Sequence, residues 1–578
     1  MLPGIKRVKF GSYGIYATGI IILALLLRIM LTALGWPPTN SDESTMGLMA
    51  LHIASFKDFP IFIYGQLYMG AFEAYLAAVL FHIFGVSLFS LRLGTMLLFT
   101  LFLTSMYLLA SLLYTKKIAL ITLALLSLGS TMMVFTELMA HGGYPEILCF
   151  GTVAFLLASR LALSSDQNPA PLRLRRMVAF GCWGLVVAVG FWSNFSMLSI
   201  ILVCGLLLVL FCWRELLRGA IWPLLLGLAI GSIPLIIYNV QAPPSQNSFA
   251  VLLTLQTRYK SLVALSPVYG HFPLLSQIWG TVLFSLPMAT GAPPLCFDSG
   301  WVLSGIGGSI LPYKCFDTLG NRGLVVIALC WSTGFIVLWF ISVFHEFRML
   351  WKLRQQLQGQ AWSPMKRRAH TRHFARLALL GSAALVLLQY ALSPVSAVYP
   401  AYGRYLTGLL IATPAVIAPL WGLSHDSAPQ SEREGPVTIK VVLRRAILLL
   451  IGVVYLIGTI SIFFEVPSVQ VVDRQQQALI HDLLSINVTH FYTDYWTCDR
   501  LAFLAKEQII CAVLDGTLHE ADTRVKGYYA IVKSDPHYVD MFPLGSEQDH
   551  NLAALAPGRY RRFVFEGYAV YQPVTNAP

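Results

Sequence analysis

The sequence predicts a polytopic α-helical membrane protein of roughly 11–13 spans, followed by a small C-terminal α/β domain. Of the 578 residues, 56% are hydrophobic and only 12% are charged, whereas soluble domains carry about 25% charged residues. The mean hydropathy is +0.67. The net charge of +12 comes largely from Lys and Arg in short segments between apolar runs. This pattern indicates cytoplasmic loops and gives no reason to expect nucleic acid binding.

The first predicted span runs from Tyr13 to Leu34 and is apolar apart from Arg28. Basic residues precede it, so we expect the N-terminus inside and the next segment outside. That outer segment, 35–70, contains an acidic pair and then a mixed, amphipathic stretch from Met46 to Leu67. The stretch suits helices that lie on the membrane surface.

Three apolar segments follow, at about 70–86, 88–113 and 118–138. Lys116 and Lys117 come after the second and belong inside, so the segment 70–86 is not expected to cross the membrane fully. The remaining runs alternate, with basic loops on one face and acidic motifs on the other. The later spans are expected at about 219–240, 323–345, 377–393, 404–423 and 446–465.

Two domains are expected. Residues 1–465 form the transmembrane core, with outer loops at 35–70 and 241–322, and residues 466–578 form a soluble extracytoplasmic domain. About 110 residues suffice for one small α/β domain. Its expected elements are helices at Gln475–Leu484 and Arg500–Lys506, and strands at His490–Tyr492, Ile509–Val513, Tyr528–Val532 and within Arg562–Tyr571.

Two pairs of the nine cysteines fall outside the predicted spans. Cys296 and Cys315 lie in the long outer loop, and Cys498 and Cys511 lie in the C-terminal domain. Both pairs could form disulfides in an oxidising space, but spacing alone leaves the pairing open.

Three acidic sites are predicted on the outer face. Asp42 and Glu43 are adjacent carboxylates at a bilayer surface, and such a pair suits a cation site or a proton acceptor. The plainer alternative is a solvated loop. Glu73 could simply solubilise an amphipathic helix, and Glu146 could cap the helix that begins after a Gly-Gly-Tyr-Pro turn.

A cationic site is predicted at the outer end of a late span, at Arg404 beside Tyr405. A guanidinium there can bind a phosphate through two nitrogens at the lipid headgroup level. An Arg that only snorkels to the interface is the alternative. His141, close to Tyr144, is either an ordinary interfacial residue or a ligand.

These motifs resemble a known group of enzymes. Asp42-Glu43, the amphipathic stretch and Phe84-Gly85-Val86-Ser87 through Arg92-Leu93 are similar to the start of the dolichyl-phosphate-mannose protein mannosyltransferase family. The lipid A aminoarabinose transferase is a relative, and both belong to the GT-C superfamily. Gly403-Arg404-Tyr405-Leu406 resembles the late Arg-Tyr-Leu of these enzymes. The resemblance covers roughly residues 13–425 in order and spacing. Glu146 departs from it, since relatives often have Asp there.

The resemblance implies a membrane glycosyltransferase. Such enzymes move a hexose or pentose from a polyprenyl-phosphate carrier to an acceptor hydroxyl on a lipid, glycan or protein, with inversion, on the extracytoplasmic face. Asp42 aligns with the catalytic Asp, with Glu43 and Glu146 as further catalytic candidates. The substrate-binding candidates are Arg404, Tyr405, Glu73, His141 and Tyr144. No cofactor is required, although a divalent cation could bind at Asp42, Glu73 and Glu146.

Two other classes of function stay open. A transporter or flippase of lipid-linked or small polar substrates would also have many spans, but it should show repeated halves and spans broken by Gly or Pro. No repeat stands out in the sequence, and its acidic motifs lie at the predicted outer surface. A non-catalytic binding protein could keep the same fold, but the acidic pair at Asp42 argues against it.

Overall fold

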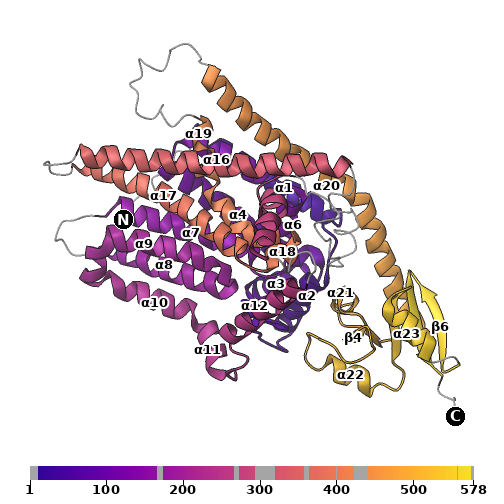
Figure 1. Ribbon diagram of the computed structural model, residues 1–578. Helices are drawn as coiled ribbons and strands as arrows, with labels where there is room; N and C mark the ends of the chain where they lie inside the picture. The colour runs from indigo at the N-terminus through magenta and orange to yellow at the C-terminus, as the bar shows by residue number, and fades with distance from the viewer. Residues whose placement is uncertain are drawn as a thin grey trace.

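The computed structural model describes residues 11–165, 173–265, 273–292, 319–356, 363–398, 400–421, 439–555 and 558–574. Across these residues, nine helices are long and apolar enough to span a membrane, or ten if one bent pair is counted. The protein is therefore a multi-pass membrane protein. Figure 1 shows the long helices lying side by side, with the C-terminal domain at one end of the bundle. The nine candidate spans comprise α1 Ser12–Ala33, α4 Leu88–Leu113, α7 Tyr144–Leu163, α8 Leu174–Ser193, α9 Leu198–Glu215 together with α10 Ile221–Gly231, α16 Leu319–Gln355, α17 Pro364–Ala391, η5 Pro400–Ala412 with α19 Thr413–Trp421, and α20 Ile439–Ser485.

In the count of nine for the described residues, the stretch Phe195–Gly231 counts once. This stretch reverses at Gly219, where φ is 108°, and α10 then returns along α8 (Figure 1). A Cβ added at Gly227 would lie 2.0 Å from the carbonyl oxygen of Gly181. Only glycine allows the two helix backbones to approach so closely, as is common in membrane bundles.

The expected span 118–138 is broken into α5 Lys116–Ser127 and α6 Thr131–Leu138, which are bent by 86°. Arg28 of α1 lies at this break. Its Nη1 donates to the carbonyl oxygen of Ser127 at 2.7 Å, and its Nη2 donates to Glu137 at 2.6 Å. Arg28, the charged residue of the first span, is therefore paired with Glu137 and with the carbonyl oxygen of Ser127, which is available because the helix breaks there.

The segment after the first span contains α2 Ser41–Ala54, β1 Phe62–Ile63, β2 Gln66–Gly70 and α3 Phe72–Phe84. The prediction of surface-lying amphipathic helices is wrong for α2, because most of its residues are buried between α3 and the C-terminal domain. Its small residues, such as Gly47, make room for both partners. α3 has 13 residues, about 20 Å of helix, which is too short to cross a bilayer.

The described parts of 241–322 are largely helical. They comprise the end of α11 Ile233–Gln241, α12 Ser248–Leu265, α13 Pro273–Gly280, α14 Leu286–Ala289 and the start of α16. Whether this segment lies on the outer face, as expected, stays a prediction. Cys296 and Cys315 lie outside the described residues, so their pairing stays a prediction.

α20 continues without interruption past residue 465, where the sequence suggested a domain boundary. It has 47 residues and leads directly from the membrane core to the C-terminal domain (Figure 1). The short helix expected at 475–484 is the last part of α20. The folded part of the C-terminal domain begins after Ser485.

The C-terminal domain is a five-stranded sheet in the order β4-β3-β5-β7-β6. β3 pairs in parallel with β4 and β5, while β5, β7 and β6 pair antiparallel. The strands are β3 His490–Thr493, β4 Ile510–Val513, β5 Val539–Pro543, β6 Tyr560–Phe565 and β7 Tyr568–Pro573, and the helices are α21 Tyr495–Leu504, α22 Tyr528–Ser534 and α23 Glu547–Leu555.

The strand predicted at Tyr528–Val532 is wrong, because this segment is α22. Gly527 begins it with a φ of 90°, and Tyr528 and Val532 are both buried at a spacing of one helical turn. β5 was not predicted. The strands expected at 490–492, 509–513 and within 562–571 are found.

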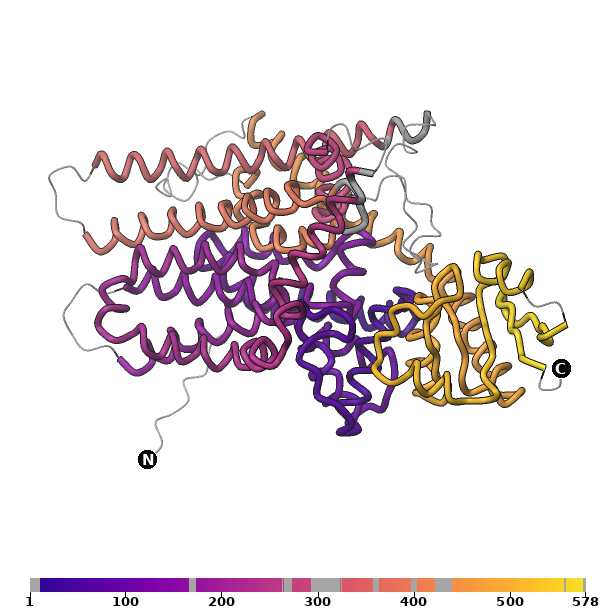
Figure 2. Tube along the Cα trace, turned by 60° about the horizontal axis from the view of Figure 1, so that its bottom comes forward, coloured from indigo at the N-terminus to yellow at the C-terminus, as the bar shows by residue number. Residues whose placement is uncertain are grey.

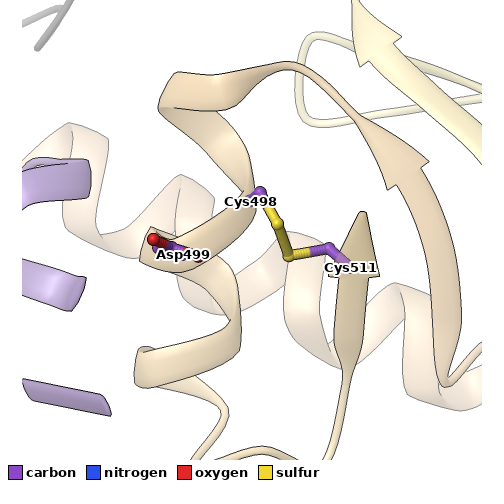
Figure 3. A group of neighbouring side chains, drawn as sticks. All are labelled: Cys498, Asp499 and Cys511. Carbon is purple, nitrogen blue, oxygen red and sulfur yellow. A yellow bond between two sulfur atoms is a disulfide. The ribbon is translucent and has the colours of Figure 1, made fainter. Parts of the chain in front are cut away.

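Cys498 and Cys511 form a disulfide that joins α21 to β4 (Figure 3). Of the two pairings that the sequence left open, this one is present. It fixes α21 against the sheet, and α21 is the helix that contacts α2 of the membrane core.

Candidate active site

The acidic pair lies in the first turn of α2. Asn40 caps this helix, and its side-chain oxygen accepts a hydrogen bond of 3.0 Å from the backbone N–H of Glu43. A helix N-terminus favours carboxylates. Successive residues on a helix point about 100° apart, so the two adjacent acids face different surroundings.

Glu43 is fully buried and forms a two-point ion pair with Arg92 of α4. Arg92 Nε donates to Oε1 at 2.8 Å, and Nη2 donates to Oε2 at 2.6 Å. Arg92 Nη2 also donates to the carbonyl oxygen of Pro37 at 2.7 Å. The pair therefore joins the first turn of α2 to a spanning helix, which suits a structural role for Glu43.

Asp42 faces the C-terminal domain instead. Its Oδ1 accepts a hydrogen bond of 2.6 Å from Nη2 of Arg524, which follows β4. The Asp42 side chain keeps 15% of its surface exposed. Burial alone would raise the pKa of Asp42, but the charges of Arg524 and Arg404 lower it below its ordinary value. Asp42 is thus held as a carboxylate with part of its surface accessible.

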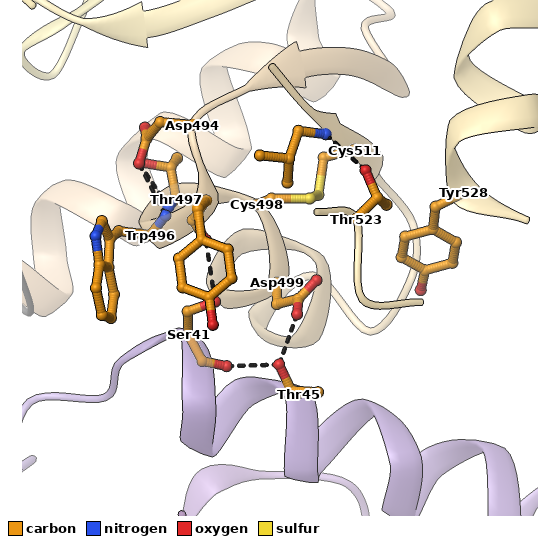
Figure 4. The surroundings of a disulfide bond; sticks show 12 residues. Ser41, Thr45, Asp494, Trp496, Thr497, Cys498, Asp499, Cys511, Thr523 and Tyr528 are labelled. Carbon is orange, nitrogen blue, oxygen red and sulfur yellow. Dashed lines mark hydrogen bonds between the residues drawn. A yellow bond between two sulfur atoms is a disulfide. The ribbon is translucent and has the colours of Figure 1, made fainter. Parts of the chain in front are cut away.

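The same turn of α2 is bound to α21 by further polar contacts (Figure 4). The Thr45 hydroxyl donates to Asp499 Oδ2 at 2.5 Å, and the Ser41 hydroxyl donates to the carbonyl oxygen of Tyr495 at 3.0 Å. The ring of Phe503 packs where Gly47 has no side chain, since an added Cβ would lie 2.5 Å from it. Figure 2 shows the two segments, distant in sequence, lying side by side.

Aromatic rings gather around the predicted cationic site. The ring of Tyr144 lies 5.0 Å from that of His141 and 5.8 Å from that of Tyr405. The Arg404 guanidinium carbon lies 5.4 Å from the Tyr144 ring centre. Arg404 also borders a small cavity together with Thr407 and Glu137. Arg404 is therefore packed against protein groups.

His141 is buried and uncharged at neutral pH. Burial and the charge of Arg404 lower its pKa to about 3. Its Nδ1 lies 2.8 Å from the carbonyl oxygen of Met139 and donates to it. Nε2 is then the acceptor nitrogen, and it is buried without a hydrogen-bond partner among the described residues. It can accept a proton or a hydrogen bond from a bound hydroxyl.

The acidic, basic and aromatic groups form one electrostatic neighbourhood. Asp42 interacts with Arg404 and His141, and both Asp42 and Arg404 interact with Tyr68 of β2. Five elements therefore contribute: the first turn of α2, β2, the His141 loop, the start of α7 and η5. We call the residues Asp42, Tyr68, His141, Tyr144, Arg404 and Tyr405 the acidic-aromatic site.

Glu73 and Glu146 form a separate buried pair. The backbone N–H groups of Gly142 and Gly143 donate to the two oxygens of Glu73 at 3.2 and 3.3 Å. Burial raises the pKa of Glu73, and Glu146 lies beside it in the first turn of α7. The two hydrogen bonds to Glu73 fix the glycine turn next to His141.

The proposed cation set does not come together in this fold. Among the described residues, Asp42, Glu73 and Glu146 do not make a group of three close enough to share an ion, and the one such group is Cys498, Asp499 and Cys511 (Figure 3). Those cysteines are joined in a disulfide, and Asp499 is bonded to Thr45. The two cysteines therefore offer no free thiolate to an ion.

Sequence reasoning missed Arg524, Thr45, Tyr68 and the residues of α21. No local motif marks them, because they act through contacts between segments far apart in the chain. Arg524 stands among acidic neighbours in Glu520-Ala521-Asp522-Thr523-Arg524, but such a run is usual on a solvated surface. Its contact with Asp42 spans 482 positions.

The fold and site together define a multi-pass membrane protein with an acidic-aromatic site beside its C-terminal α/β domain. A scan against protein-family models finds no match, and a search of the curated proteins finds none either. Among solved structures, the chain is similar to ArnT from Cupriavidus metallidurans, with 14% identity, 98% of this chain and 100% of that chain covered, and a TM-score of 0.49.

Two other solved structures are similar. The oligosaccharyltransferase AglB from Archaeoglobus fulgidus matches with 13% identity, 98% of this chain and 75% of that chain covered, and a TM-score of 0.48. The arabinosyltransferase EmbB from Mycobacterium smegmatis matches with 12% identity, 87% and 44% covered, and a TM-score of 0.32. These proteins are GT-C glycosyltransferases, the superfamily that the sequence resembles.

Proposed function

We propose that this protein is a glycosyltransferase that moves a sugar from a polyprenyl-phosphate donor to an acceptor hydroxyl on the extracytoplasmic face, with inversion. The observation that carries the proposal is the position of Asp42. It is a partly exposed carboxylate that is bonded to Arg524 and whose pKa the charge of Arg404 also lowers, in a site with several tyrosines.

Asp42 acts as the general base in this proposal. The acceptor hydroxyl gives its proton to Asp42 while its oxygen attacks the anomeric carbon of the donor sugar. The bond from that carbon to the phosphate oxygen breaks, and its electron pair leaves with the phosphate. The attack comes from the side opposite the leaving group, so the configuration inverts. The products are a glycoside and the free carrier phosphate.

Arg404 receives the leaving phosphate. Its guanidinium lies against the faces of Tyr144 and Tyr405, at 5.4 and 5.9 Å from the ring centres. A guanidinium held in this way can donate two parallel hydrogen bonds to phosphate oxygens and stabilise the charge that develops there. Tyrosine rings also suit the faces of a sugar, which are partly apolar.

The neighbouring groups have supporting roles. His141 offers its uncharged Nε2 as a hydrogen-bond acceptor for a sugar or acceptor hydroxyl. Glu43 fixes the turn that carries Asp42, and Glu73 fixes the turn next to His141. The ligands named for two of the similar structures, undecaprenyl phosphate and a dolichol-phosphate, are carriers of the class proposed here.

The test is sugar release by the purified protein in lipid nanodiscs. Polyprenyl-phosphate hexoses and pentoses with labelled sugars are supplied with a panel of lipid, glycan and peptide acceptors, and free carrier phosphate and labelled glycoside are measured together. Equal amounts of both products from the wild type, with much less of both from Asp42→Asn, support the proposal. Movement of intact labelled carrier across vesicles without transfer would instead indicate a flippase.

A further inference from the structure

We propose that the C-terminal domain completes the active site, with Arg524 as a positioning residue that holds one oxygen of Asp42 so that the other faces the acceptor hydroxyl. This inference rests on the proposed function and deepens it. It assigns a role to a domain for which the sequence alone suggested none.

Three contacts fix the Arg524 guanidinium. Nη2 donates to Asp42 Oδ1 at 2.6 Å, and Nη1 donates to the Thr45 hydroxyl at 3.3 Å. The guanidinium carbon also lies 4.8 Å from the centre of the Tyr495 ring. Only 5% of the Arg524 side chain is exposed. A buried guanidinium held on three sides fixes its partner's orientation, unlike an exposed ion pair.

Further contacts with α2, the helix that carries Asp42, fix the position of the C-terminal domain. Thr45 bonds to Asp499, and His52 Nε2 lies 2.6 Å from Glu507 Oε1. The Tyr528 hydroxyl donates to the same Glu507 oxygen at 2.8 Å. The contacts extend along α2 from its first turn to its last, so the domain cannot slide along the helix without breaking several of them.

The second Asp42 oxygen is the one available for chemistry. The charged and titratable groups that face Asp42 are Arg524, Arg404, His141, Tyr68 and Asp499. Arg524 is the group whose hydrogen bond to the Asp42 carboxylate the structure describes. Loss of Arg524 would leave this carboxylate free to rotate and would remove the nearest positive charge. The pKa of Asp42 should then rise.

The variants separate positioning from simple docking. Arg524→Gln removes the positive charge and keeps a side chain of similar length. Arg524→Lys keeps the positive charge but lacks the paired N–H donors of the guanidinium. Glu507→Gln weakens docking at the far end of α2 and leaves Asp42 untouched. Arg562→Gln is the matched control, because Arg562 is in the same domain and pairs with Asp549 at 3.4 Å.

The experiment measures turnover against pH, together with the pH dependence of carbodiimide modification of Asp42 by mass spectrometry. For Arg524→Gln we expect kcat to fall roughly 10–100-fold, with the KM for the carrier-linked sugar changed less than about twofold. The midpoint for Asp42 modification should move up by about one pH unit. Arg524→Lys should recover part of both, and Arg562→Gln should match the wild type.

Three outcomes distinguish a positioning role of Arg524 from a docking role and from failure of the proposed function. Normal kcat and an unshifted Asp42 midpoint in Arg524→Gln would overturn the inference. An equal loss of kcat in Glu507→Gln, with no midpoint shift in either variant, would reduce Arg524 to a docking residue and also overturn it. If the wild type transfers no sugar but the Asp42 midpoint still shifts in Arg524→Gln, the proposed function fails and the control of Asp42 by the C-terminal domain stands.

Discussion

Glu43 is joined to Arg92 by hydrogen bonds of 2.8 and 2.6 Å, while its neighbour Asp42 is bound by Arg524 of the C-terminal domain. Two carboxylates that look equivalent in the sequence therefore have different surroundings. One is fully buried between a helix turn and a membrane span. The other lies at the edge of the C-terminal domain and keeps part of its surface exposed.

This difference predicts opposite effects for two conservative substitutions. Asp42→Asn should lower turnover by roughly 10²–10⁴-fold and leave the melting temperature nearly unchanged. Glu43→Gln should destabilise the protein by about 3–5 kcal/mol, because it leaves Arg92 buried without its charge partner. Turnover and thermal unfolding measured on both variants check this. Full activity in Asp42→Asn with loss in Glu43→Gln would exchange their roles.

Arg404 should tolerate substitution poorly. Arg404→Lys keeps the charge but loses the planar fork that lies over Tyr144, so it should be partly active. Arg404→Ala should bind the free carrier phosphate much more weakly. Carrier affinity and thermal stability are measured side by side, with Arg258, an exposed arginine of α12, as the matched control. Wild-type affinity in Arg404→Ala would remove Arg404 from the site.

Docking of the C-terminal domain should weaken in acid. Burial alone would raise the pKa of Glu507, but hydrogen bonds from His52, Tyr528 and Lys57 lower it to about 2, against an ordinary 4.5. A lowered carboxylate pKa stabilises the folded state above pH 4.5, and this contribution is lost as the pH falls toward 2.

Limited proteolysis of the full protein between those pH values measures the loss of docking. Wild-type protein should release the C-terminal domain progressively more easily as the pH falls. Glu507→Gln should release it more easily than wild type at neutral pH and show a flatter dependence. A wild-type curve as flat as that of the variant would mean that Glu507 does not control docking.

The sidedness of the site can be tested with single cysteines. We expect a cysteine at Lys57, whose side chain is 60% exposed, and one at the exposed Lys533 to react with an impermeant reagent in intact cells. A cysteine at the exposed Arg218 should react only after lysis. Reaction at Lys57 only after lysis would place the acidic turn inside and reverse the predicted topology.

Removal of the disulfide should destabilise the C-terminal domain and then the active site. A loop of this size contributes about 3 kcal/mol, and Cys498 and Cys511 hold α21 against β4. Replacing both by Ala should lower the unfolding temperature of the domain and reduce kcat in proportion to the undocked fraction. Carrier affinity through Arg404 should stay unchanged. Unaltered stability would show that the sheet alone holds α21.

The sequence indicated much of this fold because membrane spans are local patterns. The apolar run from Tyr13 to Leu34 is long enough to predict a span by itself, and the short apolar segment near Glu73 is recognisable in the same way. The C-terminal strands next to Cys511 were found in the same way. The prediction of a strand at Tyr528–Val532 was wrong. Five residues of mixed polarity are compatible with a strand or with a helical turn, and packing against the sheet determines which of the two forms.

The candidate site was only half visible in the sequence. Asp42 and Arg404 stand in short motifs, so their residue types and neighbours marked them. Their geometry depends on Arg524 and on the glycine turn held by Glu73, which are contacts between distant segments. A local pattern carries no information about which distant side chain will meet a carboxylate. Only the folded chain brings Arg524 to Asp42.

The docking of α21 onto α2 has a consequence for the timing of biosynthesis. α2 leaves the ribosome well before α21 and Arg524. A nascent chain can therefore insert the membrane helices that precede α21 and still lack the group that we propose orients Asp42. Under this proposal, catalytic competence would begin only after the segment that carries α21 and Arg524 has folded, so a chain cut before that segment would not consume lipid-linked sugar.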